Sequence, residues 1–253
     1  MPSAPCLFVS DLHLDAALPA AVSQFIGFLQ GPARQAAALY IVGDLFESWV
    51  GDDDLDFTRE RVCAALRELT TAGVPCFVLR GNRDFLLGEG FARRANVHLL
   101  PDPVLVEFGQ VKLCLLHGDL LCTDDHAYQS LRTVVRDPLW QQRFLALDLP
   151  TRRALAGAAR RGSKAHIDRA MQQIMDVNPA AVITAFRATG TRLMVHGHTH
   201  RPATHTHVVD GDAAIRIVLG DWYTQGSCLR IEPDGRYELL TLSRSDNAAS
   251  PAR

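Results

Sequence analysis

The stretch LRGNRDF (residues 79–85) closes the apolar run PCFVL and decides how this chain folds. It places the amide side chain of Asn82 in a turn at the end of a run of strand length. Side chains that recur at the carboxyl ends of strands indicate one site shared by neighbouring strands. Four other apolar runs end in the same way, each with a carboxylate or an imidazole beside a turn: LFVSDLHLD (7–15), LYIVGDLFE (39–47), VKLCLLHGD (111–119) and LMVHGHTHRP (193–202).

Strand and helix patterns alternate outside the middle of the chain, which predicts an α/β (α+β) fold with the helices outside. Gly109-Gln110, Asp210-Gly211 and Pro233-Asp234-Gly235 supply the turns of three expected hairpins. The expected helices are 19–31, 57–71 and a short one within 85–95. The expected strands are 5–10, 38–42, 75–79, 103–108, 111–116, 192–196, 205–209, 214–219, 227–232 and 236–242.

Residues 119–190 show helical periodicity without a convincing strand, broken at Asp137-Pro138, Pro150, Gly162 and Pro179. This pattern indicates about five short helices inserted into the α/β core. We therefore expect a core of residues 1–120 and 191–243, an inserted helical cap of residues 121–190, and a disordered tail of residues 244–253.

The composition indicates an ordinary globular protein. The 253 residues carry a formal net charge of -2, which argues against nucleic acid as a partner because nucleic-acid-binding proteins usually present a basic surface. The six cysteines form no C-x-x-C pair, which suits a reducing cytosol. No signal-peptide pattern opens the sequence, and no apolar run approaches the length of a membrane span. Nothing in the sequence indicates a protein partner.

The side chains at the five strand ends form a set of possible metal ligands. Asp11 and His13 have i, i+2 spacing, so an extended backbone presents both on one face, and His196 and His198 repeat that spacing. Nitrogen and oxygen donors without thiolates suit Mn²⁺, Fe²⁺ or Zn²⁺. The set is large enough for two ions that share Asp44, the arrangement used for in-line displacement at phosphorus. The seven candidates are Asp11, His13, Asp44, Asn82, His117, His196 and His198.

Any one of these histidines alone would more often be a surface or core residue, and Asp11 or Asp44 alone could simply end a strand. The metal hypothesis depends on the recurrence at all five strand ends. His200 is expected to lie outside the ligand set. Nearby carboxylates could orient the imidazoles, namely Asp15, Asp84 and Asp119.

The series D-x-H, G-D, G-N, H-G-D and G-H-x-H over residues 7–200 resembles the calcineurin-like metallophosphoesterase superfamily. The resemblance implies a β-sandwich of two mixed sheets flanked by helices, with two divalent ions, most often Mn²⁺. By the same resemblance, the first ion would be bound by Asp11, His13, Asp44 and His198, and the second by Asp44, Asn82, His117 and His196. The residues that act in catalysis would be Asp44, Asn82, Arg83 and His196.

Arg83 departs from the superfamily pattern, in which a histidine follows the asparagine. That histidine is thought to protonate a leaving alkoxide, and arginine cannot because it stays charged at neutral pH. A phosphate leaving group is already a stable anion and needs no proton, while arginine can stabilise its charge. The substitution therefore predicts hydrolysis of a diphosphate.

The cap is basic and apolar in alternation. Residues 131–164 hold eight basic and two acidic residues, a local charge of +6. Amphipathic helices that pack on the core would explain the pattern equally well. Beside a phosphate-cleaving site, such a surface also suits an anionic lipid at a membrane.

Three further stretches, LCTDDHAYQ (121–129), GNRDF (81–85) and IMDVN (174–178), narrow the resemblance to the UDP-2,3-diacylglucosamine diphosphatases of lipid A biosynthesis. It implies a nucleotide-activated diacyl glycolipid as substrate and a peripheral location on the cytoplasmic face of the inner membrane. That family's cap motif resembles S-K-x-A-N-x-x-K and reads SKAHIDRA here (residues 163–170). Its Asn and final Lys fall on Ile167 and Ala170, and Arg169 could replace the lysine. The implied substrate contacts are Asn82, Arg83, Asp125, Ser163, Arg169 and His196.

Two other functions stay open at this point. A different dinuclear metallophosphoesterase, acting on nucleotides or nucleic acid, would be expected to carry G-N-H and to lack a basic, apolar cap. A non-catalytic interaction module would be expected to have lost ligands, and all seven are present.

Overall fold

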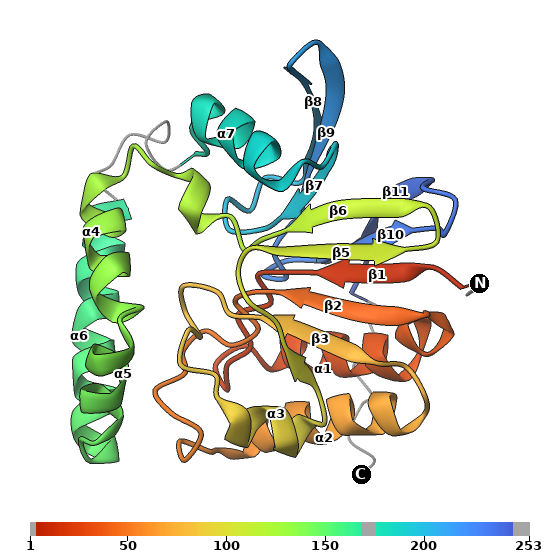
Figure 1. Ribbon diagram of the computed structural model, residues 1–253. Coiled ribbons are helices and arrows are strands. Elements are labelled where there is room, and N and C mark those ends of the chain that lie inside the picture. Colours follow the sequence, from red (N-terminus) through yellow and green to blue (C-terminus); the bar gives the residue numbers. More distant parts are fainter. Residues whose placement is uncertain (1–3, 168–175, 245–253) are drawn as a thin grey trace.

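The computed structural model describes residues 4–167 and 176–244, without the side chains of residues 162–167. Two mixed sheets form its centre (Figure 1). The strands are β1 Cys6–Val9, β2 Ala38–Val42, β3 Cys76–Leu79, β4 His98–Leu99, β5 Val104–Phe108, β6 Val111–Leu115, β7 Leu193–His196, β8 Ala203–Val209, β9 Asp212–Val218, β10 Gly226–Ile231 and β11 Tyr237–Leu242. The first sheet has the order β11-β10-β1-β2-β3-β4 and the second β5-β6-β7-β9-β8.

An apolar layer fills the space between the two sheets. Side chains alternate between the faces of a strand, so Phe8 and Tyr40 point to the second sheet while their neighbours along the chain point away from it. Phe8 stacks on Tyr40 with 4.8 Å between ring centroids, and Tyr40 stacks on Phe77 at 5.0 Å. Val195 and Ile217 of the second sheet close the layer from the other side. This burial holds the two sheets face to face.

Helices cover the outer faces of both sheets (Figure 1). Helices α1 (Pro19–Gln30), α2 (Phe57–Thr71) and α3 (Glu89–Ala95) pack on the first sheet. Asp56 caps α2 by accepting a hydrogen bond from the backbone N–H of Arg59. Helix α7 (Pro179–Thr189) packs on the second sheet through Val182 and Phe186. The layers are therefore helix, sheet, sheet and helix.

Parallel pairing brings the predicted site segments to one edge. Strands β1, β2 and β3 run parallel to one another, and so do β6 and β7 in the second sheet. The carboxyl ends of parallel strands meet at the same edge. The turns that follow these five strands carry the residues singled out in the sequence.

Helices α4 (His126–Val135), α5 (Pro138–Leu145) and α6 (Leu149–Ile167) stand beside this edge, apart from the sheets (Figure 1). No residue of α4 or α5 is buried. Arg152 of α6 pairs with Asp53, and Arg153 pairs with Asp54, both in the acidic loop before α2. Ion pairs to the core therefore hold α6 in place.

The expected sandwich of two mixed sheets flanked by helices is confirmed. One local prediction was wrong: helix α6 continues through Gly162. Arg244, the first residue of the expected tail, donates hydrogen bonds to the carbonyls of Trp222 and Tyr223. Residues 245–253 lie outside the description. Among the described residues, no helix is both long and apolar enough to cross a membrane.

Helix α7 lies within the range expected for the cap but packs on the second sheet. We therefore propose that the inserted segment is shorter than residues 121–190 and centres on α4, α5 and α6. Because α4 and α5 bury no side chain, this segment depends on its contacts with the core.

Trp222 offers a test of the packing under α1. Its fully buried ring meets the edges of Phe25 and Phe28, each at 5.7 Å between centroids. Replacing Trp222 with Ala leaves a cavity and is expected to lower the free energy of unfolding by about 3–5 kcal/mol. The exposed Phe57→Ala should change it by less than about 0.5 kcal/mol. Urea unfolding of the metal-free protein measures both, and equal effects would contradict the packing described.

Candidate metal centre

The turns at the shared edge have an unusual backbone. Seven non-glycine residues among those described have a positive φ angle, and five of them lie at this edge. The other two are Asn96 and Asp210. Such a conformation costs about 1–3 kcal/mol per residue and persists where the surroundings enforce it, often at functional sites. The five residues at this edge that adopt it are Asp11 (φ 54°), His13 (φ 48°), Asp44 (φ 52°), His198 (φ 69°) and His200 (φ 55°).

Asp84 holds two of these turns together. Its Oδ1 accepts a hydrogen bond from the backbone N–H of Gly81 at 2.8 Å, and its Oδ2 accepts one from that of Leu45 at 2.8 Å. A Cβ atom at Gly81 would lie 2.0 Å from Asp44 Oδ1, so only glycine lets the turns approach this closely. Asp84 therefore positions the Asp44 backbone and does not orient an imidazole as expected.

The first cluster of donor atoms joins Asp11, His13 and His200. The Nε2 atoms of His13 and His200 are 3.2 Å apart, and His200 Nε2 lies 3.3 Å from Asp11 Oδ1. His13 Nε2 is also 3.8 Å from Asp44 Oδ2. These three residues meet the geometric requirement for holding one ion.

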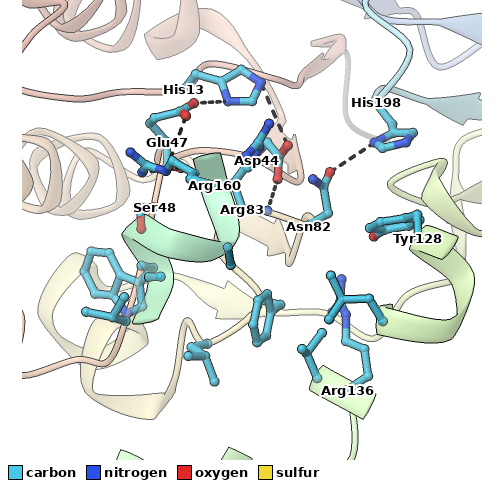
Figure 2. Close-up of a pocket in the computed structure, with 18 of the residues that line it drawn as sticks. His13, Asp44, Glu47, Ser48, Asn82, Arg83, Tyr128, Arg136, Arg160 and His198 are labelled. Atoms are coloured by element: carbon cyan, nitrogen blue, oxygen red, sulfur yellow. Dashed lines mark hydrogen bonds and ion pairs between the residues drawn. The ribbon is translucent and has the colours of Figure 1, made fainter. Parts of the chain in front are cut away.

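The second cluster gathers around Asn82. Its Oδ1 lies 2.9 Å from His117 Nε2. The same oxygen lies 3.0 Å from His198 Nδ1 (Figure 2). Asp44 Oδ2 is 3.7 Å from His117 Nε2, so the same carboxylate oxygen faces both clusters. Its other oxygen accepts the backbone N–H of Arg83 at 2.8 Å. Asp44 therefore has the geometry of a shared ligand between two ions.

The hydrogen-bond partners of the imidazoles indicate that the site suits positive charge. His117 Nδ1 lies 3.0 Å from the carbonyl of Val42, which can only accept, so a neutral His117 turns an unprotonated Nε2 toward Asn82 Oδ1. His13 Nδ1 likewise lies 2.8 Å from Glu47 Oε2. In the neutral form, lone pairs then face lone pairs in buried space, which is unfavourable unless a positive charge lies among them, either a proton on an imidazole or a bound cation. The donor set suits two divalent ions of the Mn²⁺, Fe²⁺ and Zn²⁺ class.

The charge of the site is visible in the pKa of His117. Burial disfavours its imidazolium form, but the surrounding carboxylates, Asp44 foremost, outweigh burial and raise the pKa to about 9. The cluster of acids thus attracts positive charge into a fully buried position, as a cation site must.

His196, predicted to bind the second ion and to act in catalysis, is not brought into either cluster. Its Nδ1 lies 2.8 Å from the carbonyl of Gly197, and its Nε2 lies 3.0 Å from Nη1 of Arg216. Burial lowers its pKa to about 3, so its Nε2 is the acceptor for the guanidinium. His200, placed outside the set by sequence, lies in the first cluster instead. The motif G-H-x-H starts at Gly197, so its histidines are His198 and His200.

Two carboxylates escaped the sequence interpretation. Glu47 faces His13 Nδ1, and Asp221 Oδ2 lies 3.5 Å from His200 Nδ1. A carboxylate behind an imidazole fixes the tautomer that binds a metal. Asp221 had the same signal as the five segments, because Gly220-Asp221 follows the apolar run of β9.

A cavity of about 930 Å³ opens from the clusters toward α4, α5 and α6. Arg83 and Asp125 line it, and the side chain of Asp125 also caps α4. Ser163 lies in α6, but its side chain and all of Arg169 are outside the described residues. The apolar wall includes Trp49, Phe85, Leu86, Leu131, Trp140, Phe144 and Leu155, and the basic residues are Arg83, Arg136, Arg143, Arg160 and Arg201.

Three relatives share about half of their residues with this chain. The UDP-2,3-diacylglucosamine hydrolase of Stenotrophomonas maltophilia (strain R551-3) is 50% identical over 94% of this chain and 98% of its own. Proteins with the same name from Aromatoleum aromaticum and Xanthomonas oryzae pv. oryzae (strain PXO99A) are 50% and 48% identical, each over 90% of this chain and 94% and 96% of their own. Among solved structures, the E. coli phosphoesterase YfcE covers 94% of this chain and 100% of its own at 15% identity, with a TM-score of 0.44.

The family model of the calcineurin-like phosphoesterases matches residues 4–202. That range contains the turns after β1, β2, β3, β6 and β7, and with them both donor clusters. The sequence motifs, the two-sheet architecture and this match agree, and the chain belongs to the calcineurin-like phosphoesterase family.

Proposed function

We propose that this chain hydrolyses the diphosphate of UDP-2,3-diacylglucosamine by attack of water at the α-phosphorus, giving UMP and 2,3-diacylglucosamine 1-phosphate in lipid A biosynthesis. Its family makes the chain a metal-dependent hydrolase. The observation that carries the proposal is the cavity, which joins the donor clusters and several arginines to an apolar wall. Relatives of about 50% identity bear the name of this activity.

The proposed ligands follow the geometry described above. Asp11, His13, Asp44 and His200 would hold the first ion, and Asp44, Asn82, His117 and His198 the second, with Mn²⁺ as the metal. Paired divalent ions lower the pKa of water and stabilise charge that develops on phosphoryl oxygens. The residues themselves supply a rigid frame, because the strained turns and Asp84 fix them before substrate arrives.

Arg83 is proposed to stabilise the leaving phosphate. Its backbone N–H is bound to Asp44, and its side chain lines the cavity. The guanidinium carries a fixed positive charge and can hold two phosphate oxygens at once. It cannot donate a proton at neutral pH, which suits a leaving group that needs none.

The apolar wall is proposed to receive the acyl chains. It lies partly on the core and partly on α4, α5 and α6, so the chains would lie between the two. Exposed leucines on the same helices, Leu139 and Leu145 among them, alternate with arginines. That surface supports peripheral contact with anionic lipid on the cytoplasmic face of the inner membrane. Asp125, Ser163 and Arg169 remain proposed substrate contacts.

Isotope labelling tests the position of attack. Hydrolysis of UDP-2,3-diacylglucosamine with Mn²⁺ in ¹⁸O-water is expected to place the label in UMP, because the water oxygen bonds to the α-phosphorus. Phosphorus NMR locates the label through its isotope shift. Label in the sugar phosphate would contradict the assignment, and equally fast turnover of a soluble UDP-sugar would favour a nucleotide-directed phosphoesterase.

Arg83→His tests the role of the arginine. The variant is expected to bind Mn²⁺ as the wild type does but to lose about 100-fold in kcat, because a donor to developing charge is removed. Arg83→Lys keeps the charge without the paired donors and should fall between the two. Full activity of Arg83→His would refute the leaving-group argument.

The two histidines that sequence and structure assign differently can be separated by metal content. His200→Ala is expected to lower the Mn²⁺ retained by the purified protein from two ions toward one, because the first cluster loses a nitrogen donor. His196→Gln keeps an acceptor for Arg216 and should retain both. Mass spectrometry of the metal content decides, and the reverse pattern would restore His196 to the ligand set.

A further inference from the structure

A chain of contacts runs from helix α6 to the first donor cluster. Arg160 Nη2 donates to the backbone carbonyl of Glu47 at 3.0 Å, and its Nε lies 3.7 Å from Glu47 Oε1. The other carboxylate oxygen, Oε2, lies 2.8 Å from His13 Nδ1. Figure 2 shows Glu47 between His13 and Arg160, with His13 turned toward Asp44. The chain therefore joins the inserted segment to a proposed metal ligand in two steps.

Apart from the cluster partner His200, whose Nε2 lies 3.2 Å from its own, His13 has little among the described residues to fix its ring. Tyr223 stacks on one face at 5.1 Å between centroids, which restrains tilt but leaves the tautomer open. Glu47 accepts only, so it favours the proton on Nδ1 and an unprotonated Nε2 in the cluster. The side chain of Glu47 is 22% exposed, but its Oε2 is buried against His13, so Oε1, the oxygen that faces Arg160, is the one for which water can compete.

We propose that Glu47 is a positioning residue for His13 and that Arg160 positions Glu47, so that docked α6 strengthens the first cation site. The inference rests on the ligand set of the proposed function and deepens it, because it assigns a metal-related task to a residue of the inserted segment.

A simple tether would not need this contact. Arg152 and Arg153 already join α6 to Asp53 and Asp54 in the acidic loop, away from the donor atoms. Arg160 instead binds both the backbone and the carboxylate of the residue behind His13. Arg153 is therefore a matched control: it belongs to the same helix, carries the same charge and makes an ion pair of the same kind.

The direction in which loss of Arg160 changes Mn²⁺ affinity distinguishes a positioning role from a purely electrostatic one. A positive charge repels a cation, so loss of Arg160 would strengthen Mn²⁺ binding if charge alone mattered. Positioning predicts the opposite, because Glu47 is then less often in place to orient His13.

The test is a titration of Mn²⁺ into the metal-stripped full chain without substrate, following free Mn²⁺ by electron paramagnetic resonance. Glu47→Ala is expected to weaken one of two sites about 10- to 100-fold. Arg160→Ala should weaken the same site by about threefold or more. Arg153→Ala should leave it unchanged, because the Arg152–Asp53 pair still holds α6 in place. In a Glu47→Ala background, Arg160→Ala should add nothing further, because its effect passes through Glu47.

Three results would each overturn the proposal: stronger or unchanged binding in Arg160→Ala, equal weakening in Arg153→Ala, or a full added factor in the double variant. Circular dichroism of the metal-stripped variants checks their fold. If Glu47→Ala does not fold, Glu47→Gln replaces it, since the glutamine amide oxygen still accepts a hydrogen bond from His13 Nδ1. In that case the direction of the change in Mn²⁺ affinity of Arg160→Ala decides alone.

Failure of the proposed substrate is distinguishable from failure of this inference. A wild type that binds two Mn²⁺ ions but does not hydrolyse UDP-2,3-diacylglucosamine, with the variants behaving as expected, contradicts only the proposed function. Normal hydrolysis with Arg160→Ala unchanged in Mn²⁺ affinity contradicts only the role of Arg160.

Discussion

The placement of one carboxylate oxygen, Asp44 Oδ2, is the constraint on which the site depends. It lies 3.8 Å from His13 Nε2 and 3.7 Å from His117 Nε2, so it is the point where donors from the two sheets meet. Its position follows from the backbone: a left-handed turn at Asp44, the N–H of Arg83 on its other oxygen, and glycine at position 81. The sheets supply the turns, and the turns bring together residues far apart in sequence.

Much of the fold was readable from sequence because its signals are local. Strand β2 and helix α2 have the predicted bounds, since periodicity and end signals agree there. The two-residue strand β4 has no periodicity to detect. Gly162 does not end α6, because glycine inside a helix lowers stability without forbidding the conformation.

The sequence predicted where the metal site lies, but not every residue that forms it. Recurrence at strand ends found six of the seven clustered donors, and the i, i+2 argument could not choose between His196–His198 and His198–His200. The motif G-H-x-H, counted from Gly197, already favours His198 and His200, and in the structure Arg216 of β9 binds His196 Nε2 and keeps His196 out of the clusters. The basic residues of the cap were likewise predicted to form a surface for anionic lipid. In the structure four of them pair with acidic residues elsewhere in the chain, namely Arg132, Arg152, Arg153 and Arg160. Such partners come from tertiary contacts that local sequence does not encode.

The left-handed conformation of five clustered residues lowers the stability of the fold at the positions that supply metal donors. Glycine adopts that backbone without strain, so glycine at Asp11, His13 or Asp44 is expected to relax the metal-free protein while deleting a donor. Selection for heat tolerance alone would then favour variants that no longer hold an ion. In this protein, a substitution at these turns that raises thermal stability is therefore expected to reduce metal binding.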